Sequence, residues 1–158
     1  MNLSEHVATQ FRGVYFGGNW TSVNLKESLT DVTWQHAITK VQTFNTIAVL
    51  VYHTTYYVSA VLQVLQGEPL QAKDAYSFNH PPILAQEDWE NLLDKTWTDA
   101  ELFAGLIERL LESKLWEDFS DKKYGTYYRN IHGIIEHTHY HLGQITLIKK
   151  MLLLADNK

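Results

Sequence analysis

The 158-residue sequence contains no cysteine. Disulfides, Cys-rich zinc sites, iron–sulfur clusters and thiol nucleophiles are therefore excluded together. The sequence also lacks an uninterrupted apolar stretch of about 18 residues, which is roughly the length that a transmembrane helix needs. No basic start followed by an apolar run precedes the first helical pattern. We therefore expect a cytoplasmic protein without a signal peptide or a membrane span.

An excess of positive charge is missing as well. Lys and Arg number 13 against 18 Asp and Glu, which gives a formal net charge of −5. Because a nucleic-acid surface requires clustered Lys and Arg, we expect no nucleic-acid partner. The composition is 45% hydrophobic, which is enough for a packed interior. At this length we expect one domain over residues 1–158.

The chain shows no convincing strand run and no internal repeat, and glycines and prolines divide it into helical segments. Residues 19–30 read as a connector between the first two segments. Residues 68–85 read as a long connection, since Pro81 and Pro82 cannot lie inside a helix. The predicted helices span residues 3–15, 31–66, 86–113 and 126–154. This pattern predicts an all-α four-helix bundle with a long connection between the second and third helices.

The second predicted helix has little charge. Between residues 33 and 66 there is no Asp or Glu, and the one Lys or Arg is Lys40. A helix without charge around most of its circumference is expected to be buried on more than one side. We therefore predict a homodimer with part of this helix at or near the interface. The alternative is that its neutral polar residues meet solvent.

Two histidines of the fourth predicted helix point to a metal site. His137 and His141 are four residues apart, so they lie on one helix face with Cβ atoms about 6 Å apart. Helical angles place both in the apolar sector, whereas His132 and His139 fall on the opposite face, where Glu136 can pair across one turn. Two imidazoles at this spacing can bind one divalent ion. The alternative is a pair of hydrogen-bonded core histidines.

The third ligand is expected from another helix. His53 is the one histidine deep in the neutral second helix. A single histidine there is usually a satisfied core residue, but beside the pair it completes a three-histidine site. Tyr57, one turn further on, could present its hydroxyl to the same cavity. His6, His36 and His80 are weaker candidates, because they lie near a chain end, on another helix face and in a proline-rich loop.

The ligand set narrows the metal and its role. Thr138 stands where a zincin motif requires Glu, and the second predicted helix offers no Glu to a di-iron site. Three neutral histidines without a carboxylate suit Zn²⁺ or Ni²⁺, with Fe²⁺ and Mn²⁺ less favoured. Three protein ligands leave open positions for water or substrate, which is typical of a catalytic site.

Several segments carry a family resemblance that extends over nearly the whole chain. The chain resembles the DinB-like (YfiT-type) superfamily of metal-binding four-helix bundle proteins. The matching segments are residues 46–53 (TIAVLVYH), residues 133–145 (GIIEHTHYHLGQI), Asn19 with Trp20, residues 65–70 (LQGEPL) and Trp89.

The resemblance implies a fold, a ligand set and a range of activities. The metal ligands of the family correspond to His53, His137 and His141. Its members are often dimers, and characterised relatives include thiol S-transferases, a maleylpyruvate isomerase and metal-dependent hydrolases. The expected function is a metal-dependent enzyme that is either thiol S-transferase-like or hydrolase-like, acting on a small molecule with or without a low-molecular-weight thiol. The alternative is a non-catalytic metal-binding or stress-response bundle protein.

The reaction itself is left open by the sequence, because no carboxylate is fixed near the three histidines by spacing. One structural expectation concerns access to the metal. Residues 68–85 should lie over or beside the end of the bundle rather than form a fifth core helix. Aromatic side chains from this segment, or from Tyr56 and Tyr57, should narrow the access to the metal. The alternative is a plain crossover packed against the outside.

Overall fold

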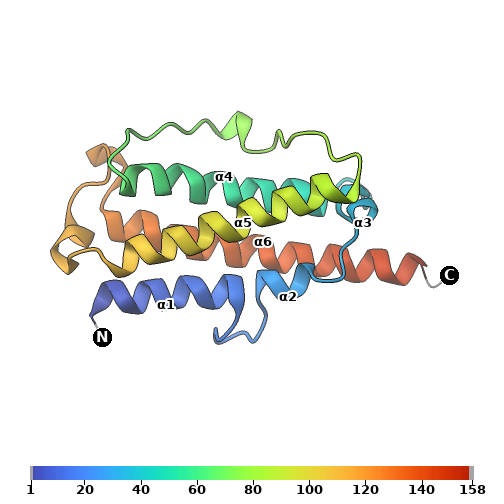
Figure 1. Ribbon diagram of the computed structural model, residues 1–158, viewed down its shortest axis with the longest axis horizontal. Helices are drawn as coiled ribbons and strands as arrows, with labels where there is room; N and C mark the ends of the chain where they lie inside the picture. Colours follow the sequence, from blue (N-terminus) through green and yellow to red (C-terminus); the bar gives the residue numbers. More distant parts are fainter. Residues whose placement is uncertain (1, 157–158) are drawn as a thin grey trace.

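The structure, a computed structural model, describes residues 2–156. These residues are all-helical and contain no β-strand, which confirms the predicted fold class (Figure 1). Single 3-10 turns occur in the connections, among them η1 at Asp74–Tyr76, η2 at Glu112–Trp116 and η3 at Lys122–Tyr124. The α-helices are α1 (Leu3–Phe16), α2 (Leu25–Leu29), α3 (Trp34–Ile38), α4 (Ile47–Leu65), α5 (Gln86–Glu108) and α6 (Tyr127–Asp156).

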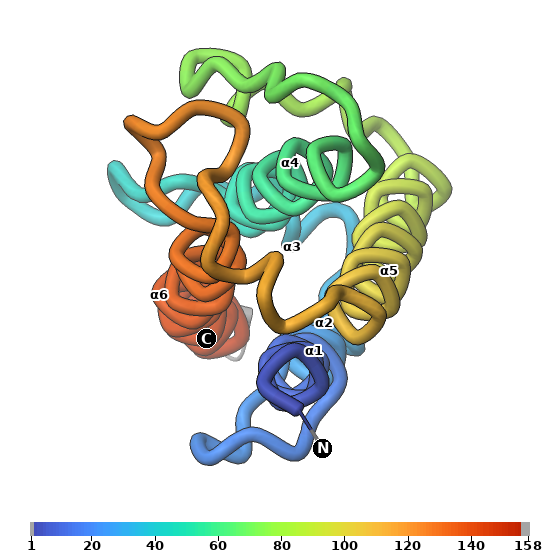
Figure 2. The backbone as a smooth tube through the Cα atoms, turned by 90° about the vertical axis from the view of Figure 1, so that its left-hand side faces the viewer, coloured from blue at the N-terminus to red at the C-terminus, as the bar shows by residue number. Residues whose placement is uncertain are grey.

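The four long helices lie side by side around one core (Figures 1 and 2). Helix α4 packs on α5 and α6, and α1 packs on the same two helices. The short helix α2 packs on α1 and α6, whereas α3 packs on α4 and α5. The histidine-bearing helices α4 and α6 are therefore direct neighbours.

Both of these helices begin at a threonine. The Thr46 hydroxyl accepts a hydrogen bond from the Val49 backbone N–H at 3.2 Å, directly before the first residue of α4. The Thr126 hydroxyl does the same for the Arg129 N–H at 3.2 Å, directly before α6. A threonine oxygen in this position satisfies a backbone donor that has no partner within the helix. Local sequence thus sets where each of these helices starts.

The second predicted helix, residues 31–66, is wrong at its N-terminal half. Its first part is the short helix α3, and a loop of residues 39–46 separates α3 from α4. Thr39 is extended, with ψ 126°, and Gln42 has a positive φ of 49°, so the helix cannot continue through them. Helix α4 then begins directly after Thr46, whose side chain caps it.

Two other boundaries also differ from the prediction. The connector at residues 19–30 contains the one-turn helix α2, which Asn24 caps. The third predicted helix was expected to reach residue 113, but α5 ends at Glu108. Beyond it the chain turns through Arg109 into the 3-10 turn η2. Such shifts are typical, because helix ends depend on tertiary contacts as much as on propensity.

Helix α4 is buried within a single chain. Twelve of its 19 residues are buried, and its remaining polar side chains are uncharged. By length and composition it is the one described helix that could cross a membrane, but 67% of that window is buried inside the protein, as expected of a core helix. Burial against neighbouring helices therefore accounts for much of the missing charge. The homodimer remains a prediction.

Aromatic side chains hold α1 against α5. The ring centroids of Phe11 and Tyr15 lie 4.6 Å apart, and those of Phe11 and Phe103 lie 4.8 Å apart in an edge-on arrangement. Trp89 at the start of α5 is fully buried, and its indole N–H donates to the Val32 carbonyl at 2.8 Å. These contacts help to fix α1 and α5, of which α5 packs against α4 and α1 packs against α6.

We expect Phe103→Ala to lower the free energy of unfolding by about 3–5 kcal/mol, because a fully buried ring is replaced by a cavity. Leu102→Ala is the matched control, since Leu102 is the next residue on α5 and is 41% exposed. It should cost only about 0.5 kcal/mol or less. Urea unfolding followed by circular dichroism measures both values. Equal losses in the two variants would contradict the placement of this core.

Candidate metal centre

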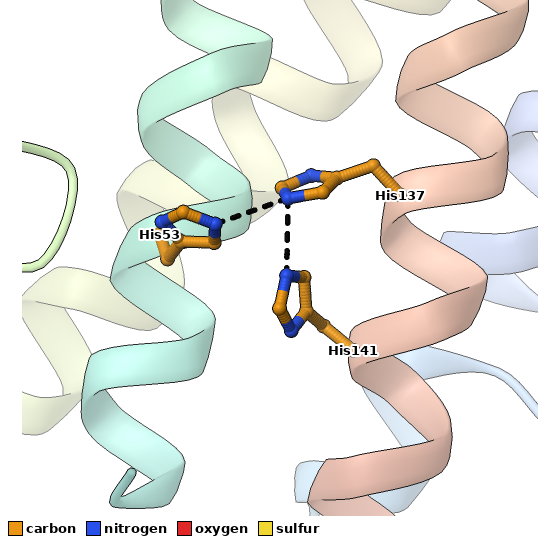
Figure 3. Close-up of side chains that lie close together, drawn as sticks. All are labelled: His53, His137 and His141. Atoms are coloured by element: carbon orange, nitrogen blue, oxygen red, sulfur yellow. Dashed lines mark hydrogen bonds between the residues drawn. The ribbon is translucent and has the colours of Figure 1, made fainter. Parts of the chain in front are cut away.

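Three histidines converge between α4 and α6 (Figure 3). His53 comes from α4, and His137 and His141 come from successive turns of α6. The Nε2 atom of His137 lies 3.0 Å from Nε2 of His53 and 3.0 Å from Nε2 of His141. The possible ligand atoms of all three residues lie within 4.8 Å of one another, so they could hold a metal ion. The structure thus brings together the trio that the sequence singles out.

The outer ring nitrogens of two of these histidines have fixed partners. His53 Nδ1 lies 2.8 Å from Ser77 Oγ, and that hydroxyl already donates its hydrogen to the Asp74 carbonyl at 2.7 Å. Ser77 must therefore accept a hydrogen bond from His53 Nδ1–H. His141 Nδ1 lies 2.7 Å from the amide oxygen of Gln144, which can only accept. Both rings thus carry their hydrogen on Nδ1 and direct an Nε2 lone pair toward the third histidine.

This arrangement leaves more lone pairs than hydrogens at the centre. A neutral His137 carries at most one hydrogen on Nε2, while the Nε2 lone pairs of His53 and His141 both lie 3.0 Å away. A cation could accept the lone pairs of all three rings. Nitrogens about 2.0–2.1 Å from a zinc ion at tetrahedral angles are about 3.3 Å apart, close to the separations found here. Two of the three nitrogen–nitrogen separations are therefore close to those of a metal site.

Electrostatics favour the neutral, metal-binding form of each ring. Burial lowers the pKa of His53, His137 and His141. For His137, burial together with the neighbouring His141 and His53 lowers the pKa to about 4. The Asp74 carboxylate partly offsets this lowering of the pKa of His53 and His137. Neutral imidazole is the form that coordinates metal, so protons compete weakly for these rings near neutral pH.

A pocket of about 490 Å³ opens beside the cluster. It lies between α4, the turn η1 and the first half of α6. A small molecule in this pocket would reach the side of the cluster formed by His53 and His137. Its polar lining comprises His53, His137, Tyr57, Asp74, Arg129, Asn130 and Glu136.

The crossover segment, residues 68–85, supplies part of this site. Its described residues form one 3-10 turn and no fifth core helix, as expected. The Phe78 ring stacks on the His53 ring with centroids 4.1 Å apart, and Ser77 of the same segment is fully buried. The Tyr56 hydroxyl accepts from the Lys73 backbone N–H at 2.8 Å and so ties the segment to α4. The segment therefore lies beside the cluster, while its role in access remains a prediction.

Tyr57 lines the pocket, as expected, but its hydroxyl is directed to the Asp74 carboxylate. The hydroxyl donates to Asp74 Oδ1 at 2.6 Å, and the Tyr57 ring lies edge-on to both His53 and His137 with centroids 5.2 Å away. Burial and this hydrogen bond raise the pKa of Tyr57 to about 12, so its hydroxyl stays protonated. This hydrogen bond thus fixes the Asp74 side chain at the pocket.

The other histidines lie outside the cluster, as the helical angles predict. His132 Nδ1 is 3.5 Å from Glu136 Oε1, which confirms the pairing across one turn. Among the described residues, His53, His137 and His141 form the one group that could hold a metal. Glu136 nevertheless lines the pocket, although it was expected to face away from the site. Glu136 directly precedes His137 on α6, and its exposed side chain forms part of the pocket lining.

Several functional residues escape prediction from the sequence. Gln144 belongs to the helix motif, and its spacing of three residues from His141 could have indicated a hydrogen bond between them. Ser77 and Asp74 carry no such signal, because a loop conformation places them. Arg129 lies eight residues before His137, a helical spacing that could have placed both on one face.

Comparisons of the chain with protein-family models, with curated proteins and with solved structures give no match.

We expect His137→Ala to abolish stoichiometric binding of zinc or nickel, since His137 Nε2 lies between the other two ligand nitrogens. The loss of affinity should exceed about 100-fold, the upper range for removal of an outer partner of a ligand. His139→Ala is the control, because it removes a histidine of the same helix that lies outside the cluster. Equilibrium dialysis with elemental analysis measures the metal content. Unchanged metal content in His137→Ala would reject this residue as a ligand.

The metal-free protein should lose stability as the pH falls from about 6.5 toward about 4. The folded pKa of His137 is about 4, below the value near 6.5 of an unfolded chain. Between these pH values the unfolded state therefore binds more protons than the folded state. The free energy of unfolding consequently falls as the pH falls. Above about 6.5 both states are neutral and the group has no effect.

Urea unfolding at a series of pH values, with a chelator present, measures this dependence. His137→Gln should show a smaller loss across this range than the unsubstituted protein. His139→Gln serves as the control and should keep the full loss. The same pH dependence in His137→Gln and in the unsubstituted protein would show that His137 is not its source.

Proposed function

We propose that this chain is a metal-dependent enzyme in which His53, His137 and His141 hold a divalent ion. The observation that carries the proposal is the convergence of three Nε2 atoms while the Nδ1 atoms of His53 and His141 are already occupied. As purely structural residues, the three rings would share at most one hydrogen among their Nε2 atoms, so one of the two 3.0 Å contacts would lack a donor of its own. The neighbouring pocket gives a small molecule access to the same atoms.

The donor set fits Zn²⁺ or Ni²⁺. All three candidate ligands are imidazoles, and the Asp74 carboxylate lies in the pocket but outside the ligand group. Three protein ligands leave a position open, as in catalytic sites. When bound, such an ion lowers the pKa of a coordinated water or thiol and so supplies a nucleophile near neutral pH.

The residues around the cluster have their own parts in this proposal. Ser77 and Gln144 fix the orientation of His53 and His141 through their hydrogen bonds. Phe78 covers one face of the His53 ring and keeps water from it. Asp74, oriented by the Tyr57 hydroxyl, is placed at the pocket to accept a proton from the nucleophile.

Two nucleophiles fit this chemistry. Water would make the protein a hydrolase, and a low-molecular-weight thiol would make it an S-transferase. Both reactions need an O–H or S–H group whose proton is removed beside the three histidines. The geometry of the site therefore suits both, and an experiment is needed to separate them.

The family resemblance supports the same proposal. Its two strongest segments, residues 46–53 and residues 133–145, fall on α4 and α6 where all three histidines lie. We further propose that α1, α4, α5 and α6 form a DinB-like four-helix bundle. A cytoplasmic homodimer is part of this proposal.

The test compares metal-loaded and metal-free protein in two assays. A thermal-shift screen against low-molecular-weight thiols reports binding, because a ligand at 100 times its Kd stabilises the folded state by about 2.7 kcal/mol. A second assay follows hydrolysis of activated esters and amides without thiol. His137→Ala is the control for metal dependence in both assays.

A rise in melting temperature with a thiol that requires the metal supports S-transfer. Metal-dependent turnover without thiol supports hydrolysis. A protein that binds metal stoichiometrically but shows neither response would contradict the enzyme proposal. It would instead favour the non-catalytic metal-binding alternative.

A further inference from the structure

Arg129 lines the same pocket as the histidine cluster without a charged partner of its own. It is the one Lys or Arg among the pocket-lining residues. Across the described residues its guanidinium forms no ion pair and no hydrogen bond, although its backbone N–H is bonded to Thr126. The other two arginines differ: Arg12 pairs with Glu101 and Glu108, and Arg109 ends α5 away from the pocket.

The backbone before α6 is shaped around the Arg129 side chain. Gly125 has a φ of 76°, and a Cβ atom built on it would lie 2.7 Å from Arg129 Cδ. Any larger residue at position 125 would therefore displace the arginine stem. The absence of a side chain there leaves room for the stem of the exposed Arg129 side chain beside the loop.

The space between Arg129 and the histidines is open. Arg129, Gly133 and His137 follow one another at intervals of four residues, so they form one stripe along α6. A Cβ atom on Gly133 would meet no atom within 4 Å, and Gly133 itself lines the pocket. Eight residues at 1.5 Å each separate Arg129 from His137 by about 12 Å along the helix. The pocket is thus lined by a cation and by the candidate metal site about two helical turns apart along α6.

The two acidic residues of the pocket already have partners. Asp74 accepts the Tyr57 hydroxyl at 2.6 Å, and Glu136 lies 3.5 Å from His132 Nδ1. Their charges offset a divalent ion at the histidines and would disfavour a doubly charged phosphate. A singly charged, planar carboxylate matches the guanidinium of Arg129, which binds such groups through two parallel N–H donors.

We propose that Arg129 binds a carboxylate on the far end of an extended substrate whose reacting group lies at His53, His137 and His141. This inference rests on the proposed function, since it assigns the substrate class of the same site. A substrate of this class carries its carboxylate several bonds away from the reacting atom, because Arg129 and His137 are about two helical turns apart on α6.

The experiment uses cobalt-loaded protein and two thiol probes of equal length, 6-mercaptohexanoate and its neutral amide 6-mercaptohexanamide. Thiol binding to cobalt changes the visible absorption spectrum, so a titration gives the Kd of each probe. We expect the carboxylate probe to bind about 3–10-fold more tightly than the amide, the range of one charge-assisted contact at a partly exposed site. Thioglycolate, which is too short to reach Arg129, provides the length control.

Arg129→Gln should remove the preference for the carboxylate, so that the ratio of the two Kd values falls to about one. Arg129→Lys should keep part of the preference, because it retains the charge but not the paired donors. Arg109→Gln is the matched control, since it removes one exposed arginine outside the pocket, and it should bind both probes as the unsubstituted protein does.

Equal affinity for the two probes in the unsubstituted protein would overturn the inference and leave the proposed function standing. A preference that persists in Arg129→Gln would overturn it as well. If neither thiol changes the cobalt spectrum, no thiol binds at the metal and this inference fails, whereas the hydrolase form of the proposed function is decided by the ester and amide assay.

Discussion

The packing of α4 against α6 is the contact on which the site depends. His53 stands on one helix and the other two histidines stand on the second, so the cluster exists only while these helices keep their register. A shift of one residue along either helix would rotate a ring by about 100° and move it by 1.5 Å. The geometry of the histidine cluster therefore also depends on the threonines that start both helices and on the buried residues of α4 that face α6.

Hydrogen bonds outside the cluster complete this control. Ser77 and Gln144 decide which nitrogen of their histidine carries the hydrogen, and so decide which nitrogen faces the centre. One partner is local, three residues along α6, and the other comes from the crossover segment. The crossover is consequently a structural part of the site, tied to α4 by Tyr56, Tyr57 and His53.

The same contacts explain why α4 carries no charge. Its buried polar side chains satisfy their hydrogen bonds within the protein: the Thr54 hydroxyl donates to the Val51 carbonyl at 2.9 Å, and Thr55 and Thr96 share a hydrogen bond of 2.7 Å. Neutral hydroxyls can be buried at modest cost when they are paired in this way, whereas a charged residue would require an equally buried partner. An uncharged helix between α5 and α6 is thus a requirement of one chain, whatever its oligomeric state.

The sequence by itself determined the helical class, the position of the long helices α1, α5 and α6, and the three histidines. These features follow from periodicity and spacing along one helix, which act over a few residues and are legible without tertiary contacts. His53 was the least direct inference: alone on a neutral helix it would be taken for a core residue, and it was selected because the His137–His141 pair required a third partner. The break at residues 39–46 was missed, because no proline or glycine marks it and the backbone turns there through Gln42 at positive φ.

Only the tertiary structure decided what surrounds the histidines. Ser77, Asp74 and Phe78 lie 21 to 25 positions after His53 in the chain, and a loop rather than a helical repeat brings them to it. The conformation of such a loop depends on its contacts with α4, which no local pattern encodes. Arg129 follows helical spacing, yet its access to the pocket depends on the bare backbone at Gly125 and Gly133 and on the space left by the crossover. The three histidines that could hold a metal were therefore legible in the sequence, whereas the shape and charge of the pocket arose from packing between distant segments.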